Sequence, residues 1–138
     1  MEQYYWTYLA IFIGIATLVV QTFVAMRAHR KQKQYIPGIV DEKLGHESFV
    51  FRSHRTYQNS LENAPLMFFT LILAMMVNVD PFTLAILAWV FVVARIIHMM
   101  LYYKIATEKN PSPRSYFFLI AFLANVVTLF LIGGKFLG

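Results

Sequence analysis

Long apolar runs separated by short polar segments dominate the chain. A helix needs about 20 consecutive, mainly apolar residues to cross a bilayer. The pattern therefore predicts an all-α membrane protein, a bundle of four transmembrane helices within one membrane domain over residues 1–138. The expected spans are 8–27, 48–78, 82–103 and 114–133, with loops at 28–47 and 104–113.

The second predicted span differs from the others because its first half is polar. Arg55, Asn59 and Glu62 are spaced by four and three residues, so they lie on one face of a helix. A charge at membrane depth costs at least ~2.5 kcal/mol on insertion scales, and such a residue suggests a functional site. This polar face is therefore the first candidate for function.

The third predicted span carries a matching set of polar residues. Arg95, His98 and Tyr102 share one face, and a tight turn makes spans two and three antiparallel neighbours. At 1.5 Å per residue, Glu62 lies about 10 Å from Arg55 along the helix axis, and Arg95 lies equally far from Tyr102. We therefore expect the two faces to run in register, with Glu62 level with Arg95.

Two interpretations of these faces remain open. In the first, Glu62 and Arg95 neutralise each other and the other polar groups only hold the helices together. In the second, the two faces and Arg114, at the start of span four, form a pocket rich in hydrogen-bond donors. Such a pocket suits a small polar anion that also carries an ammonium group.

Composition and charge support a membrane protein rather than a nucleic-acid partner. The chain is 59% hydrophobic and 14% charged, whereas soluble domains average about 25% charged residues. The net charge is +5, but seven basic residues lie within 27–55 and three more within 104–114. This asymmetry predicts that both loops are cytoplasmic and both termini lie on the opposite side.

The sequence predicts no metal site. It contains no cysteine, which excludes disulfides, thiolate metal ligands and a cysteine nucleophile. His29 and His46 lack further ligands at metal-binding spacing, so we expect them to be solvated or hydrogen-bonded.

The polar residues also carry a family resemblance. Arg-x-x-x-Asn-x-x-Glu-x-x-Pro, from Arg55 to Pro65, resembles the signature of the MAPEG proteins (membrane-associated proteins in eicosanoid and glutathione metabolism). Arg95-x-x-His98-x-x-x-Tyr102 is similar to the third-helix motif of that family. The length, the four spans and the long first loop agree, so the resemblance covers essentially the whole chain.

The resemblance implies a homotrimer that binds glutathione between subunits near the cytoplasmic face. It implies that Arg114 stabilises the glutathione thiolate and that Ser115 can donate a hydrogen bond to the sulfur. The residues implied to bind glutathione are Arg27, Arg55, Asn59, Glu62, Arg95, His98 and Tyr102. Gln58 stands where some family members have a basic residue, which leaves the recognition of the glutathione carboxylates open.

The expected activity is that of a membrane-bound glutathione transferase in detoxification, with peroxidase activity as an extension. Its partners would be glutathione, membrane lipids, and a hydrophobic electrophile or lipid hydroperoxide from the bilayer. A non-catalytic lipid-binding protein on the same scaffold is the alternative, because a fold does not by itself imply catalysis. A four-span transporter fits less well, because the first span has no acidic residue.

Overall fold

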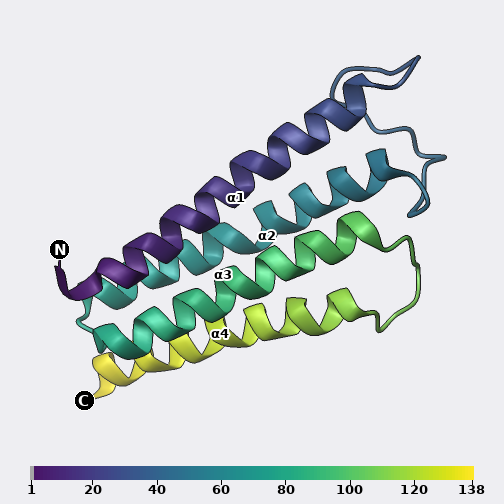
Figure 1. Cartoon of the computed structure of the whole chain (residues 1–138). Helices are drawn as coiled ribbons and strands as arrows, with labels where there is room; N and C mark the ends of the chain where they lie inside the picture. Colours follow the sequence, from purple (N-terminus) through teal and green to yellow (C-terminus); the bar gives the residue numbers. More distant parts are fainter. Residues whose placement is uncertain (1) are drawn as a thin grey trace.

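Four long helices form an antiparallel bundle in the computed structural model, which describes residues 2–138. A short 3₁₀ helix, η1 (Glu2–Tyr4), leads directly into α1 (Tyr5–Arg30). The others are α2 (Phe49–Met76), α3 (Pro81–Lys104) and α4 (Pro113–Leu137). Both termini lie at one end and the two long loops at the other (Figure 1). The expected all-α four-helix bundle is therefore confirmed.

Two proline-containing segments determine where α3 and α4 begin. The Asp80 carboxylate accepts hydrogen bonds of 2.8 Å from the backbone N–H and the hydroxyl of Thr83, and Pro81 follows at the first helical position. At α4, Ser112 precedes Pro113 in the same way. An acceptor before the helix and a proline at its first position both favour initiation, because the first N–H groups lack intrahelical partners.

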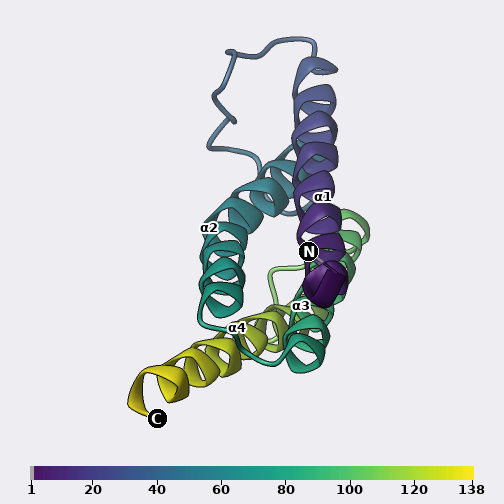
Figure 2. The ribbon, with the colours of Figure 1, turned by 90° about the vertical axis from the view of Figure 1, so that its left-hand side faces the viewer.

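A hydrogen bond joins two elements at the end that holds the termini. At that end the Tyr4 hydroxyl donates a 2.8 Å hydrogen bond to the Val79 carbonyl, which ties the start of the chain to the α2–α3 turn. In Figure 1 α1 and α4 diverge toward the loops, whereas Figure 2, which looks from the terminal end, shows the C-terminal end of α4 lying apart from α1.

Small side chains allow the helices to approach one another closely. Four alanines are at most 2% exposed: Ala10, Ala74, Ala88 and Ala121. A Cβ atom on Gly14 of α1 would come within 2.7 Å of the Phe68 ring of α2. Such small residues are typical of helix contacts in membranes, where van der Waals packing drives association.

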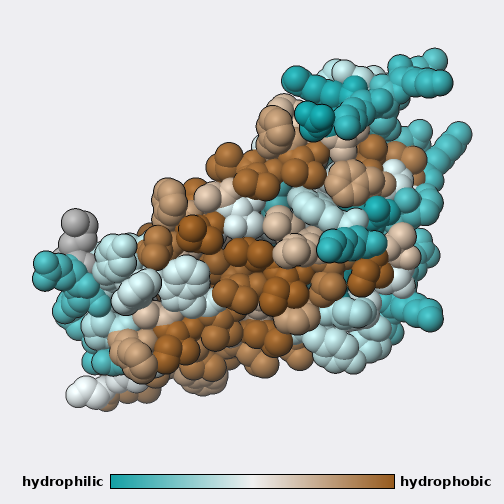
Figure 3. Space-filling view, viewed as in Figure 1, coloured by the Kyte–Doolittle hydropathy of each residue, from teal (hydrophilic) through white to brown (hydrophobic). Residues whose placement is uncertain are grey.

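Three helical segments are long and apolar enough to cross a membrane: Glu2–Arg30, Pro81–Lys104 and Pro113–Leu137. Helix α2 has 28 residues, but its first half carries the polar face described above. Figure 3 shows a broad hydrophobic band between a hydrophilic loop end and a more polar terminal end. The chain is thus an integral membrane protein by composition, and that α2 also spans the bilayer stays a prediction.

The Asp80 cap gives the first testable prediction. Hydrogen bonds from the Thr83 backbone and hydroxyl lower the pKa of the Asp80 carboxyl. A lowered pKa means that this carboxylate stabilises the fold above its ordinary pKa and that the contribution is lost as the pH falls. As the pH is lowered below about 4, we expect the thermal midpoint of the wild type in detergent to decrease more steeply than that of Asp80→Asn. Equal pH dependence in the two proteins would contradict this role for Asp80.

Candidate functional site

A cavity of about 510 Å³ opens at the loop end of the bundle between α2, α3, α4 and both loops. Its walls include six of the nine residues selected from the sequence. These are Arg55 and Asn59 from α2, His98 and Tyr102 from α3, and Arg114 and Ser115 from α4. The predicted register of α2 against α3 is what brings the first four together. That these residues bind a ligand stays a prediction.

Arg114 is held in this cavity by three contacts. Its guanidinium lies 4.0 Å from the centre of the Tyr102 ring, and Nη2 donates a 2.8 Å hydrogen bond to the Thr107 carbonyl. Nε donates a longer bond of 3.4 Å to the Ser112 hydroxyl. The side chain is 7% exposed, and a cation over an aromatic face is worth about 2 kcal/mol when desolvated. The position of Arg114 is thus well defined.

Several buried polar atoms at the cavity wall have no hydrogen-bond partner within residues 2–138. They are Nη1 of Arg114, Nδ1 of His98 and Oδ1 of Asn59. Leaving a buried polar group unsatisfied costs about 1–3 kcal/mol, and more for a charged group. These three atoms are themselves buried, so the polar surface of the cavity comes from other atoms of its lining residues.

His46, which the sequence analysis did not select as a site residue, also lines the cavity. Its Nε2 lies 3.2 Å from the Tyr102 hydroxyl, and its Nδ1 lies 3.7 Å from the Glu108 carboxylate. Arg52 fixes this part of the first loop, because its guanidinium donates to the carbonyls of His46 (2.7 Å) and Tyr103 (3.3 Å). Sequence spacing could not identify His46, since its contacts come from the packing of two loops.

The polar face of α2 is confirmed, but the predicted pair of Glu62 with Arg95 is wrong for the protomer. Glu62 lies 3.8 Å from Arg55, two turns away on the same face of α2. Glu62 is 61% exposed, and it does not line the cavity. Arg95 instead donates a 3.0 Å hydrogen bond to the Ser60 hydroxyl. The predicted depth of Arg95 along α2 is correct to within two residues. Ser60 and Glu62, however, are two residues apart on the helix and therefore point in different directions, and Arg95 lies on the side of Ser60.

Arg95 faces a separate small cavity of about 20 Å³ between α1, α2 and α3. It is 6% exposed, and its Nε and Nη1 have no hydrogen-bond partner among the described residues. Gln21 of α1 lines the same cavity and is 1% exposed, with its Oε1 also unpartnered. The volume is sufficient for one water molecule between the two side chains. Within the protomer, Arg95 is therefore packed between α1, α2 and α3 and does not line the cavity around Arg114.

The two remaining predicted residues have distinct positions. Arg27 lies exposed near the end of α1 and does not line the cavity of the protomer. The Ser115 hydroxyl accepts a 3.2 Å hydrogen bond from the Ser112 backbone N–H, so it helps to cap α4. The proton of that hydroxyl remains available for donation toward the cavity. Within residues 2–138, no three His, Asp or Glu side chains are grouped as metal ligands.

The Arg95–Ser60 contact gives a second prediction. Ser60→Ala would remove the one hydrogen bond of a buried guanidinium, at an expected cost of about 1.5–3 kcal/mol. Ser53→Ala is the matched control, because Ser53 is equally buried in α2 but donates only to the Val50 carbonyl of its own helix. Thermal unfolding in detergent should show the larger loss for Ser60→Ala. Equal losses would mean that Ser60 does not stabilise Arg95.

Comparison with known families supplies one match. The model of the MAPEG family matches residues 6–134, which is nearly the whole chain. Comparisons with curated proteins and with solved structures give no match.

Proposed function

Because the chain belongs to the MAPEG family, we propose that it is a glutathione transferase of the membrane, with glutathione bound in the cavity around Arg114. The second substrate is a hydrophobic electrophile or a lipid hydroperoxide that reaches the cavity from the bilayer. The loops face the cytoplasm and the termini the opposite side, as the distribution of basic residues favours.

One observation supports this proposal: a buried guanidinium, fixed by the Thr107 carbonyl and the Tyr102 ring, belongs to the wall of the cavity. Nη1 of Arg114 is unpartnered, while Nη2 and the Tyr102 ring hold the side chain in place. A free thiol has a pKa near 8.5, and a neighbouring arginine lowers it toward neutral pH. Arg114 is therefore the residue suited to hold the glutathione thiolate.

Other residues would bind the rest of the tripeptide. Glu62 carries an exposed carboxylate that can take the glutathione ammonium while it remains beside Arg55. Arg55 and His98, which line the cavity, would bind its carboxylates, and Asn59 its amide groups. Arg27 would approach from a neighbouring subunit, because it lies outside the cavity in its own protomer.

The reaction itself needs no general base on the enzyme. The thiol releases its proton to solvent, and the sulfur lone pair forms the new C–S bond while the leaving group departs with its electron pair. The enzyme contributes by stabilising the anion in a site with little water, where fixed donors act most strongly. Ser115 can add a second donor to the sulfur through its hydroxyl proton.

We propose that the protein assembles as a homotrimer through α2. The outer face of α2 exposes Leu61, Leu66 and Phe69 beside Glu62. A carboxylate on a face directed at lipid would be costly, so protein is the better neighbour for this surface. A trimer in which α2 lines the subunit interface would cover Glu62 and bring neighbouring residues to each cavity.

The role of Arg114 can be tested by thiolate absorbance and turnover. Arg114→Ala should return the bound thiol to a pKa near 8.5 and so remove most of the thiolate and most of the conjugation of an aryl halide at neutral pH. Calorimetry should still show glutathione binding. Arg114→Lys, which keeps the charge but not the planar group, should retain part of the thiolate absorbance and turnover. Lys104→Gln is the control, because Lys104 does not line the cavity, and it should retain both in full. Unchanged thiolate absorbance in Arg114→Ala would refute the assignment.

The assembly can be tested by crosslinking, because the chain contains no cysteine. A single Phe69→Cys on α2 should give oxidised, disulfide-linked dimers in membranes. Phe130→Cys on α4 is the matched control, since Phe69 and Phe130 are 71% and 75% exposed in the protomer. Equal crosslinking at the two positions would contradict an interface formed by α2.

A non-catalytic lipid-binding protein is the second candidate. An apolar groove of about 620 Å³ between α3, α4 and Trp6 favours it, with Phe82, Trp89 and Phe117 among its walls. The same groove is also suited to the hydrophobic substrate of a transferase. Conjugation of glutathione to an aryl halide by the purified protein separates the two functions.

A further inference from the structure

The imidazole of His46 lies between the two loops and lines the cavity around Arg114. Its Nε2 is 3.2 Å from the Tyr102 hydroxyl of α3, and its Nδ1 is 3.7 Å from the Glu108 carboxylate of the second loop. The imidazole is also stacked on the Tyr102 ring, with the two centroids 5.9 Å apart and the two planes at 27°. The proposed function gives this side chain no role.

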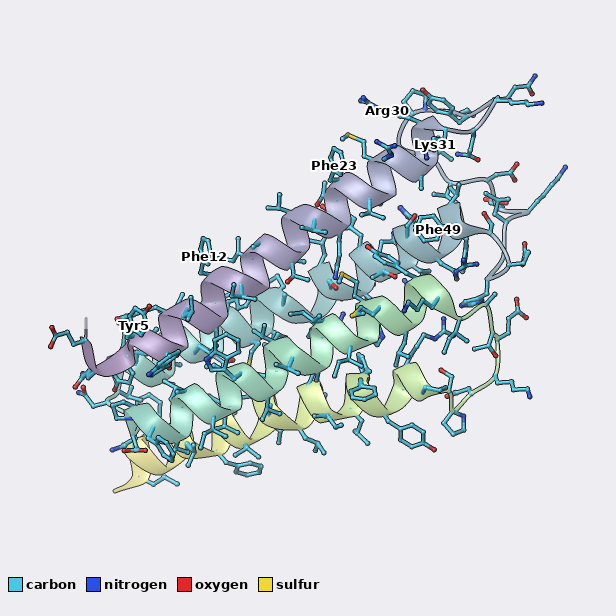
Figure 4. All side chains as sticks on the ribbon, in the orientation of Figure 1. Tyr5, Phe12, Phe23, Arg30, Lys31 and Phe49 are labelled. Atoms are coloured by element: carbon cyan, nitrogen blue, oxygen red, sulfur yellow. The ribbon has the colours of Figure 1, made fainter. Side chains whose placement is uncertain are left out.

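Further contacts hold His46 in this position. The Arg52 guanidinium donates hydrogen bonds of 2.7 and 3.0 Å to the carbonyls of His46 and Glu47. Arg52 in turn lies 5.6 Å from the centre of the ring of Phe49, which is the first residue of α2 (Figure 4). The Phe51 ring meets the imidazole edge-on at 4.9 Å. His46, although it belongs to a loop, is therefore held in place by α2.

The two neighbours of the imidazole determine its hydrogen bonding. A carboxylate can only accept, so Glu108 favours the tautomer with the proton on Nδ1. Nε2 of that tautomer is an acceptor, and the Tyr102 hydroxyl donates to it. A protonated imidazole would instead donate from Nε2 to the Tyr102 oxygen. His46 and Tyr102 are therefore joined in both protonation states.

Tyr102 needs such a partner because it lies in the last turn of α3, which ends at Lys104. The last turn of a helix lacks part of its backbone hydrogen bonding and frays readily. The Arg114 guanidinium lies 4.0 Å from the centre of the Tyr102 ring. A cation is attracted to an aromatic face only when it lies within about 6 Å of the ring centre. A bond that fixes Tyr102 therefore also helps to fix Arg114.

The contacts of His46 complete a closed cycle around Arg114. Arg114 donates to the Thr107 carbonyl at 2.8 Å, and the next residue, Glu108, lies beside His46. His46 bonds to Tyr102, whose ring faces Arg114. Glu108 is 78% exposed, and exposed ion pairs contribute little. The bond between His46 and Tyr102 is therefore the contact of His46 that matters most for this cycle.

We propose that His46 is a positioning residue of the site, which holds the Tyr102 side chain so that the Arg114 guanidinium is aligned with the sulfur of glutathione. This role rests on the proposed function and adds a residue to it. His46 acts through Tyr102 and does not itself touch the sulfur. Loss of His46 should therefore lower the fraction of thiolate, and with it kcat, more than the affinity for glutathione.

The test compares two replacements of His46 in the full chain, purified in detergent. The amide of glutamine reaches the position of Nε2 and can keep the bond to Tyr102, whereas that of asparagine reaches only Nδ1. His46→Asn should shift the absorbance titration of the bound thiolate to higher pH and lower kcat at neutral pH about tenfold, as loss of an outer supporting partner does. Glutathione affinity by calorimetry should change little. His46→Gln should restore both the titration and kcat.

A double-mutant cycle separates this role from general destabilisation. Tyr102→Phe removes the hydroxyl that His46 holds, so adding His46→Asn to it should not shift the thiolate titration further. Additive shifts would mean that the two side chains act independently and would overturn the proposal. Lys43→Gln, in the first loop but outside the cavity, should behave like the wild type. Equal shifts in Lys43→Gln and His46→Asn would also overturn it.

The outcomes distinguish this role from the transferase function. A wild type that forms no thiolate with glutathione would refute the function and the positioning role together. The same thiolate titration in the wild type and His46→Asn would overturn the positioning role alone. The contact can also be observed without glutathione, by NMR of protein with isotope-labelled histidine. The Nε2 resonance of His46, assigned by its loss in His46→Gln, should move in Tyr102→Phe, and an unmoved resonance would contradict the proposal.

Discussion

The buried guanidinium of Arg114 against the Tyr102 ring is the interaction on which the loop end of the bundle depends. It joins α3 to α4, and through the 2.8 Å bond to the Thr107 carbonyl it also fixes the second loop. Tyr102 in turn lies 3.2 Å from His46, so the first loop is attached to the same centre. A cation that is 7% exposed needs such support, because a buried charge without partners is costly.

The two buried arginines of the bundle lie beside cavities of very different size. Arg114 belongs to the wall of a cavity of about 510 Å³. Arg95 is similarly buried but faces a cavity of about 20 Å³, which is sufficient for one water molecule. Two arginines of similar burial thus have different surroundings, one beside a large cavity and the other beside a small one.

The sequence predicted the four helices because long apolar runs and proline-containing turns are local signals. It also predicted that Arg55, Asn59, His98 and Tyr102 would meet, since helix rise fixes their depth. It failed for Arg95, which bonds to Ser60 rather than Glu62, because depth along an axis does not determine which face a side chain uses. His46 was missed because two loops, without periodic structure, place it beside Tyr102 and Glu108.

The hydrogen bond of Tyr4 to the Val79 carbonyl has a mechanical consequence. It ties the start of the chain to the α2–α3 turn at the end where the termini lie. The bond does not include α4, whose C-terminal end lies apart from the start of α1 (Figure 2). Loss of the Tyr4 hydroxyl would therefore free the first residues of the chain from the α2–α3 turn and leave the contacts of α4 unchanged.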